Sequence, residues 1–189
     1  MDYFLLRQDE RYVNTPIIKN MVEKIDRKYL REENLYKIED LNIFRIMGSD
    51  YETDYLDILD TQIYLYSDRL MELIRKFDEK VTTKRITLID IKRKIQRNYH
   101  LPILEEISAF SKDTEIYSFK EKHRLEYMEE ALERNQIKKL ILDADKIKDK
   151  QIFKIKEIAG TAVVVDLHVA EALLRRDFKG IKLERIDVS

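Results

Sequence analysis

The chain has 189 residues, of which 44% are hydrophobic and 39% are charged, and its 36 basic and 37 acidic side chains nearly cancel. This length and composition suit a single globular domain, residues 1–189, that buries roughly 70% of its unfolded surface. The lack of cysteine excludes disulfides and thiol chemistry, and the balanced charge gives no case for nucleic-acid or membrane-surface binding. Residues 4–6 form an apolar run far shorter than a signal-peptide core, and no run approaches a membrane span, so we expect a cytoplasmic protein.

The first 48 residues are expected to form a strand, a helix and a hairpin. Residues 3–6 have the composition of a short strand. Thr15 and Pro16 are typical of an N-cap and a first helical residue, and apolar side chains follow at a period of 3.6, so a helix is expected over residues 16–29. Alternating apolar residues at 35–38 and 43–46 predict the two strands of a hairpin.

A strand–helix–strand unit occurs twice, at residues 63–89 and 162–188. In each copy a residue that can cap a helix, Ser67 or Asp166, follows an apolar strand. A helical stretch and a second strand come next, and Gly180 ends the helical part of the second copy. Such units normally join parallel strands. We therefore predict an α+β fold with a mixed β-sheet and packed helices.

Further elements are expected between the two units. They are a basic helix at 90–99, a short helix at 102–107, a strand at 116–119, a helix at 121–134, and strands at 137–142 and 152–156. The total is about seven or eight strands and four or five helices.

The sequence contains no catalytic or cofactor motif. The three histidines lack the spacing of metal ligands on one helix face, and each is better explained by a structural or surface role: His100, His123 and His168. The three glycines are isolated, so neither a P-loop nor a dinucleotide-binding turn can be formed. We therefore expect a protein that is not an enzyme and that holds no metal or cofactor.

Two other classes stay open. The acid-x-lysine pairs at 90–92 and 177–179 allow a metal-dependent hydrolase or nuclease built from scattered carboxylates. An oligomeric scaffold or regulatory subunit is also compatible with the sequence, which does not fix the oligomeric state.

The most distinctive charge pattern is an acidic, tyrosine-rich stretch, because residues 46–68 contain no lysine or arginine. Tyrosine offers a large contact area at low entropic cost, and carboxylates attract a basic partner over long range. We therefore expect a basic protein partner to bind at Asp50, Tyr51, Glu52, Asp54, Tyr55, Asp57 and Asp60. The alternative is a solvated loop whose tyrosines pack onto the core. Basic clusters elsewhere are better explained as solvated faces than as a nucleic-acid site.

Several apolar segments around a strand–serine–helix element carry a resemblance to a known family. They are residues 57–60, 63–68, 101–107, 152–155, 170–176 and 180–183. Over residues 55–188 the chain resembles immunity protein family 11 of bacterial polymorphic toxin systems, a family of formerly unknown function. The resemblance implies a non-catalytic, cytoplasmic antidote that binds a cognate toxin made by the same cell.

Overall fold

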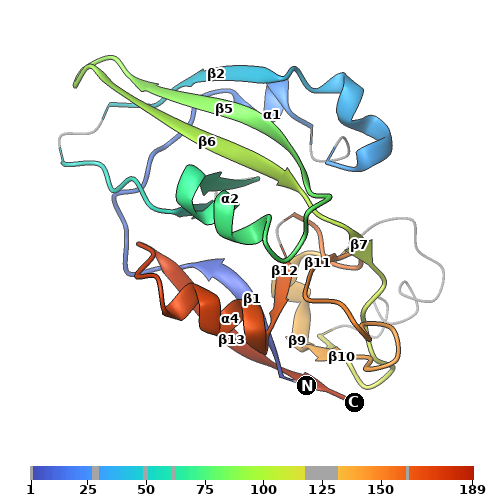
Figure 1. The fold of residues 1–189 in the computed structure, drawn as a ribbon. Coiled ribbons are helices and arrows are strands. Elements are labelled where there is room, and N and C mark those ends of the chain that lie inside the picture. Colours follow the sequence, from blue (N-terminus) through green and yellow to red (C-terminus); the bar gives the residue numbers. More distant parts are fainter. Residues whose placement is uncertain (1, 27–29, 49–50, 61–62, 118–131, 161) are drawn as a thin grey trace.

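The computed structural model describes residues 2–26, 30–48, 51–60, 63–117, 132–160 and 162–189. These residues form two mixed β-sheets with two helices between them (Figure 1). The predicted α+β class is confirmed, although the chain is richer in strands and poorer in helices than expected.

The five-stranded sheet has the order β2-β5-β6-β4-β3. Its strands are β2 (Leu41–Arg45), β3 (Ile58–Asp60), β4 (Tyr64–Ser67), β5 (Thr82–Asp90) and β6 (Ile95–Ile103). Only the β2–β5 pair is parallel.

The six-stranded sheet has the order β10-β13-β1-β12-β11-β7. Its strands are β1 (Tyr3–Gln8), β7 (Glu106–Ile107), β10 (Ile141–Leu142), β11 (Ile152–Ile155), β12 (Val163–Asp166) and β13 (Ile181–Val188). A separate pair joins β8 (Glu115–Ile116) to β9 (Ile137–Lys139) in antiparallel fashion.

Both predicted strand–helix–strand units are present. α2 (Asp68–Ile74) connects β4 to β5, and α4 (Leu167–Leu174) connects β12 to β13. In each unit the two connected strands are parallel but not adjacent, because an antiparallel strand lies between them. This middle strand is β6 in the first unit and β1 in the second.

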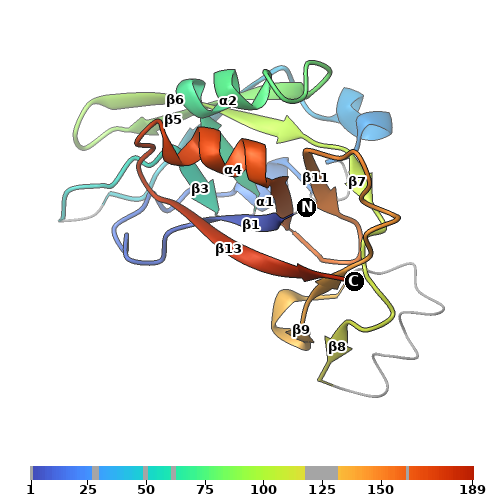
Figure 2. The same cartoon turned by 60° about the horizontal axis from the view of Figure 1, so that its bottom comes forward.

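The correspondence between the two units extends over most of each sheet. The series β2-β3-β4-α2-β5-β6 has the same topology as the series β10-β11-β12-α4-β13-β1. β4 and β12 begin 99 residues apart, as do β5 and β13. The two chain ends lie side by side (Figures 1 and 2), so β1 takes the place of a strand that would follow β13. We call the two series the first half and the second half.

Ser67 and Asp166 cap the two helices, as predicted. The Ser67 hydroxyl accepts a hydrogen bond from the Leu70 amide at 3.2 Å, and the Asp166 carboxylate accepts one from the Val169 amide at 2.9 Å. Each bond satisfies an amide that the first turn of a helix leaves without a partner.

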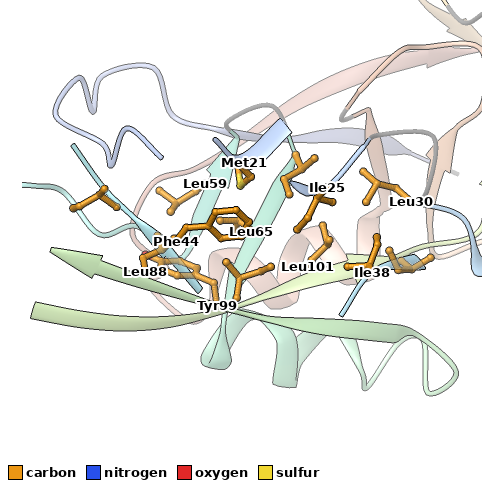
Figure 3. Close-up of a cluster of buried hydrophobic side chains, with 14 of the residues drawn as sticks. Met21, Ile25, Leu30, Ile38, Phe44, Leu59, Leu65, Leu88, Tyr99 and Leu101 are labelled. Carbon is orange, nitrogen blue, oxygen red and sulfur yellow. The ribbon is translucent and has the colours of Figure 1, made fainter. Parts of the chain in front are cut away.

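Three apolar clusters hold the sheets and helices together. The central cluster contains buried side chains from α2 and α4 and from both sheets, among them Tyr66 on β4 and Val165 on β12. A second cluster lies on the other face of the five-stranded sheet, where α1 (Met21–Lys24) brings Met21 against Phe44 and Leu65 (Figure 3). A third covers the other face of the six-stranded sheet.

The predicted helix at 16–29 is wrong for the residues that the structure describes. Only the single turn α1 is helical, and residues 27–29 lie outside the described residues. Asn20 has a left-handed backbone (φ 56°), and Ile18 forms an antiparallel bridge with Ile46. The apolar side chains therefore reach the core from an irregular segment that follows the sheet edge.

The hairpin predicted at 35–46 is also wrong, although its second strand, expected at 43–46, is present as β2. Residues 35–37 belong to the 3₁₀ helix η2 (Glu32–Lys37), and β2 pairs in parallel with the distant β5. The helix predicted at 90–99 from its 3.6-residue pattern is wrong as well, because these residues form the turn of the β5–β6 hairpin and parts of its strands. Lys94 occupies the left-handed position of this turn (φ 57°), so the turn lacks the glycine that would have predicted it.

The remaining predictions are resolved only in part. The helix expected at 102–107 is wrong, since Pro102 lies in β6 and residues 106–107 form β7. Of the strand at 116–119, residue 116 lies in β8, and residues 118–131 lie outside the described residues together with most of the helix expected at 121–134. The end of that helix is instead the 3₁₀ helix η3 (Arg134–Gln136). The strands expected at 137–142 and 152–156 are confirmed as β9, β10 and β11.

Candidate functional site

The predicted partner-binding residues lie on the segment that leads from β2 to β3, at the left of Figure 1, except Asp60, which is the last residue of β3. Asp50 lies outside the described residues. Tyr51 and Glu52 are exposed, with 72% of Tyr51 accessible to solvent. These two side chains are available for contact with another molecule.

Asp57 is the residue of this segment most deeply built into the fold. It is buried, and its carboxylate accepts hydrogen bonds from the Ser67 hydroxyl at 2.5 Å and from the Lys179 amide at 2.8 Å. The Asp57 amide in turn donates to the Lys179 carbonyl at 2.9 Å. Asp57 therefore ties the cap of α2 to the loop that follows α4.

Asp54 pairs with the same loop. Its carboxylate lies 2.8 Å from the Lys179 ammonium, and its amide donates to the Asn14 carbonyl at 2.9 Å. The hydrogen bond that the Lys179 ammonium donates to Asp54 raises the pKa of Lys179. The charge of Asp54 is thus largely matched within the protein.

Tyr55 and Asp60 are both partly buried. The Tyr55 ring packs against the second apolar cluster, and the Arg97 guanidinium lies 5.3 Å from its centroid. Burial raises the pKa of Tyr55, with the Asp90 carboxylate as a lesser cause. The Asp60 amide donates to the Gln8 side chain at 3.0 Å. For Tyr55 the structure agrees with the alternative that tyrosines of this stretch pack onto the core.

A basic hairpin lies beside the acidic segment, over residues that the sequence predicts as a basic helix. Arg93, in the β5–β6 turn, donates a side-chain hydrogen bond to the Tyr51 carbonyl and lies 3.1 Å from the Asp90 carboxylate. The Arg93 amide also donates to Asp90, and these bonds lower the pKa of that carboxyl. The local signal for the β5–β6 turn is Asp90 itself, because an aspartate that accepts a hydrogen bond from a nearby backbone amide is typical of a turn.

The segment is anchored from the core side as well. The buried Tyr99 hydroxyl, on β6, donates to the Leu56 carbonyl at 3.0 Å, and burial raises the pKa of Tyr99. Gly180 has a left-handed backbone (φ 83°) and packs against Leu56 so closely that an added Cβ would lie 2.6 Å from its Cδ1. Residues of both halves therefore contact the segment that leads into β3.

A groove lies elsewhere, between η2, the α2–β5 loop and the end of β6. It has a volume of about 790 Å³ and carries both acidic and basic side chains. Glu106 in this groove is paired with Arg31 at 3.0 Å and with Lys154 at 2.8 Å. The mixed charges favour no class of small ligand.

Two of the three histidines pair with a carboxylate at a helix start. His100 lies 2.6 Å from Asp68, and His168 lies 3.3 Å from Asp166, while His123 lies outside the described residues. Within the described ranges, no three His, Asp or Glu side chains are grouped so that they could hold a metal ion. The carboxylate-based hydrolase alternative therefore has no site among these residues.

The described residues form a strand-rich α+β protein, and the segment for which the sequence predicts a partner contact leads into β3. No helix within the described part of the chain is long and apolar enough to cross a membrane. The chain belongs to an immunity protein family: the sequence model of the Immunity protein family (Imm11) matches residues 42–188. This membership implies a cognate toxin as partner. No curated protein matches the sequence.

Proposed function

We propose that the protein neutralises its cognate toxin by binding it directly, without catalysis and without a cofactor. The observation that carries this proposal is the family match over residues 42–188, which takes in every element from β2 to β13 except the first residue of β2. An inhibitor that acts by binding needs a stable fold and a complementary surface, and it needs no reactive group.

We further propose that the segment from residue 50 to residue 60 contributes to the contact. Tyr51 and Glu52 have the exposure that contact requires. Asp54 and Asp57 support the segment from within, through Lys179. An exposed aromatic ring beside a carboxylate suits a partner with a basic surface, because the ring supplies contact area and the charge speeds association.

The test uses the toxin domain encoded beside this gene, purified with its active site inactivated. We expect the wild-type protein to bind it tightly and to protect cells from the active toxin. Glu52→Lys should slow association about tenfold at low salt, with a smaller effect at high salt, because exposed charges are screened. Tyr51→Ala should mainly speed dissociation.

The matched control is Glu79→Lys, which reverses an exposed acid in the α2–β5 loop. If the wild-type protein neither binds nor protects, neutralisation by direct binding is wrong. If the wild type binds and the Glu52 and Glu79 variants associate equally fast, the toxin contacts another surface.

A further inference from the structure

We propose that the outer edge of β2, at Leu41 to Ile43, receives an extended antiparallel strand of the cognate toxin. This inference rests on the proposed function and names the part of the surface that supplies the backbone contacts. Addition of a strand to an exposed sheet edge is a general mode of recognition, in which main-chain hydrogen bonds give affinity and side chains give specificity.

The outer edge of β2 has open backbone groups. β2 is the first strand of its sheet, and β5 is its only strand partner among the described residues. The Arg85 amide donates to the Asp40 carbonyl, and the Ile46 amide donates to the Ile89 carbonyl, so the even-numbered residues make the ladder to β5. The backbone groups of Leu41 and Ile43 therefore point away from the sheet.

The second half shows what occupies the matching edge. There, β9 and β10 are separated only by Leu140, and residues 109–117 run antiparallel along their outer side (Figure 2). The contacts include the Phe110–Leu142 bridge, the β8–β9 pair, and the hydrogen bond from the Tyr117 amide to the Gln136 carbonyl at 3.0 Å. An antiparallel segment, which includes β8, thus covers this edge of the second half.

In the first half, the chain segment that lies along the equivalent edge of β2 is short. Residues 17–19 bond only to the end of β2, where the Lys19 amide donates to the Arg45 carbonyl at 3.1 Å and the Met47 amide donates to the Ile17 carbonyl at 2.8 Å. Asn20, with its left-handed backbone, then turns the chain away into α1. The next positions along this edge, beside Leu41 to Ile43, have no strand among the residues that the structure describes.

The open edge also gathers exposed apolar side chains. Of the eleven large hydrophobic residues exposed in the described part of the chain, five belong to β2 or to segments bonded to its end: Ile17, Leu41, Ile43, Met47 and Ile91. The two on β2 itself are about half exposed, at 46% and 50%. Exposed apolar side chains on an open strand edge are suited to contact with another chain.

The charges beside the edge favour a different chain over a second copy of this one. Arg45 and Arg85 are exposed, share the face of Leu41, and have no ion-pair partner within the described ranges. Antiparallel pairing of two copies about Ile43 would place Arg45 of one copy opposite Leu41 of the other, in the same row as Arg85. In that row one strand separates the two arginines, and like charges about 10 Å apart repel each other. The fitting occupant is a strand with apolar and acidic side chains on this face.

The test compares edge variants with matched surface variants in binding to the inactivated toxin domain. The double variant Leu41→Lys, Ile43→Lys keeps the strand but makes its edge charged, as natural proteins do to prevent strand addition. We expect it to fold and to lose at least about tenfold in affinity. Val13→Lys and Leu174→Lys change apolar residues that are more exposed than Leu41 and Ile43 and lie away from this edge, and they should bind like the wild type.

Amide hydrogen exchange followed by NMR gives the direct measurement. The amides of Leu41 and Ile43 should exchange at least about tenfold more slowly in the complex, because strand addition bonds them, whereas a contact through side chains alone would leave them fast. If the wild type binds and these amides stay fast, or if the edge variant binds equally well, the inference is wrong while the proposed function stands. A wild-type dimer in light scattering that the edge variant abolishes would assign the edge to a second copy. No binding by the wild type would refute both proposals.

Discussion

Asp57 and Lys179 lie 122 residues apart in the sequence and hold each other by two hydrogen bonds. The Asp57 carboxylate accepts from the Lys179 amide at 2.8 Å, and the Asp57 amide donates to the Lys179 carbonyl at 2.9 Å. One residue lies at the entrance to β3 and the other at the exit of α4. This pair therefore joins the two halves at the base of the proposed contact segment.

Replacing Asp57 by Ala should destabilise the protein by about 2–4 kcal/mol, because the change leaves the Lys179 amide and the Ser67 hydroxyl without their buried acceptor. Asp54→Ala removes only a partly exposed ion pair and should cost less than about 1 kcal/mol. Urea unfolding of both variants measures the difference. Equal losses would mean that Asp57 is not the link between the halves.

We infer that the two halves form a single domain, since the central apolar cluster contains side chains from both sheets. The Asp57→Ala variant should then unfold in one transition at a lower urea concentration, with the same midpoint by circular dichroism and by tyrosine fluorescence. Two separate midpoints would instead indicate that each half unfolds on its own.

Gly180→Ala should destabilise the protein by roughly 2 kcal/mol or more, for two reasons that act together. The backbone at Gly180 is left-handed, and an added Cβ would lie 2.9 Å from the Cβ of Leu56. Gly48→Ala is the matched control, since its nearest neighbour would be the flexible end of Lys92 at 3.4 Å. Thermal unfolding should show a large loss for the first variant and little change for the second.

Asp9 should make the protein sensitive to acid. Side-chain and backbone hydrogen bonds from Arg11 lower the pKa of Asp9 to about 2 in the folded state, below the value of about 3.9 expected in the unfolded chain. A lowered folded-state pKa means that the stabilising contribution is complete above pH 4 and is lost as the pH falls toward 2. The melting temperature of Asp9→Asn should therefore lie below that of the wild type at neutral pH, and the gap should shrink below about pH 4.

An exposed acid without an ion-pair partner among the described residues, Asp113, provides the comparison. The Asp113→Asn variant should follow the wild type across the whole pH range. A gap for Asp9→Asn that stays constant down to pH 2 would contradict the role assigned to the Arg11 contact.

The two strand–helix–strand units were predictable because each has an apolar strand, a capping residue and a glycine or turn in local sequence. The helices expected at 16–29 and 90–99 failed because apolar spacing alone does not reveal long-range pairing. Residues 17–19 bond to the end of β2, and β6 pairs with β5 and β4. In the candidate site, the exposure of Tyr51 and Glu52 agrees with their polar surroundings in the sequence. The burial of Asp57 depends on Lys179, which no local pattern connects to it.

The equivalence of the two halves predicts that the chain can be circularly permuted. β1 completes the second half from the other end of the sequence, and Arg185 on β13 pairs with Asp2 at 2.7 Å, so residues near the two ends of this chain lie close together. A short Gly-Ser linker from Ser189 to Met1, with new ends between Val13 and Asn14, would place both halves in the same strand order. Val13 is 80% exposed, so its side chain makes no buried contact that the new ends would disturb. We expect the permutant to fold with a melting temperature within about 5 °C of the wild type.

Opening the chain between the buried Leu5 and Leu6 should prevent folding, since it divides β1, a central strand of the six-stranded sheet. If the first permutant is unfolded by circular dichroism, β1 depends on its own connection to the first half, and the second half is not a complete unit.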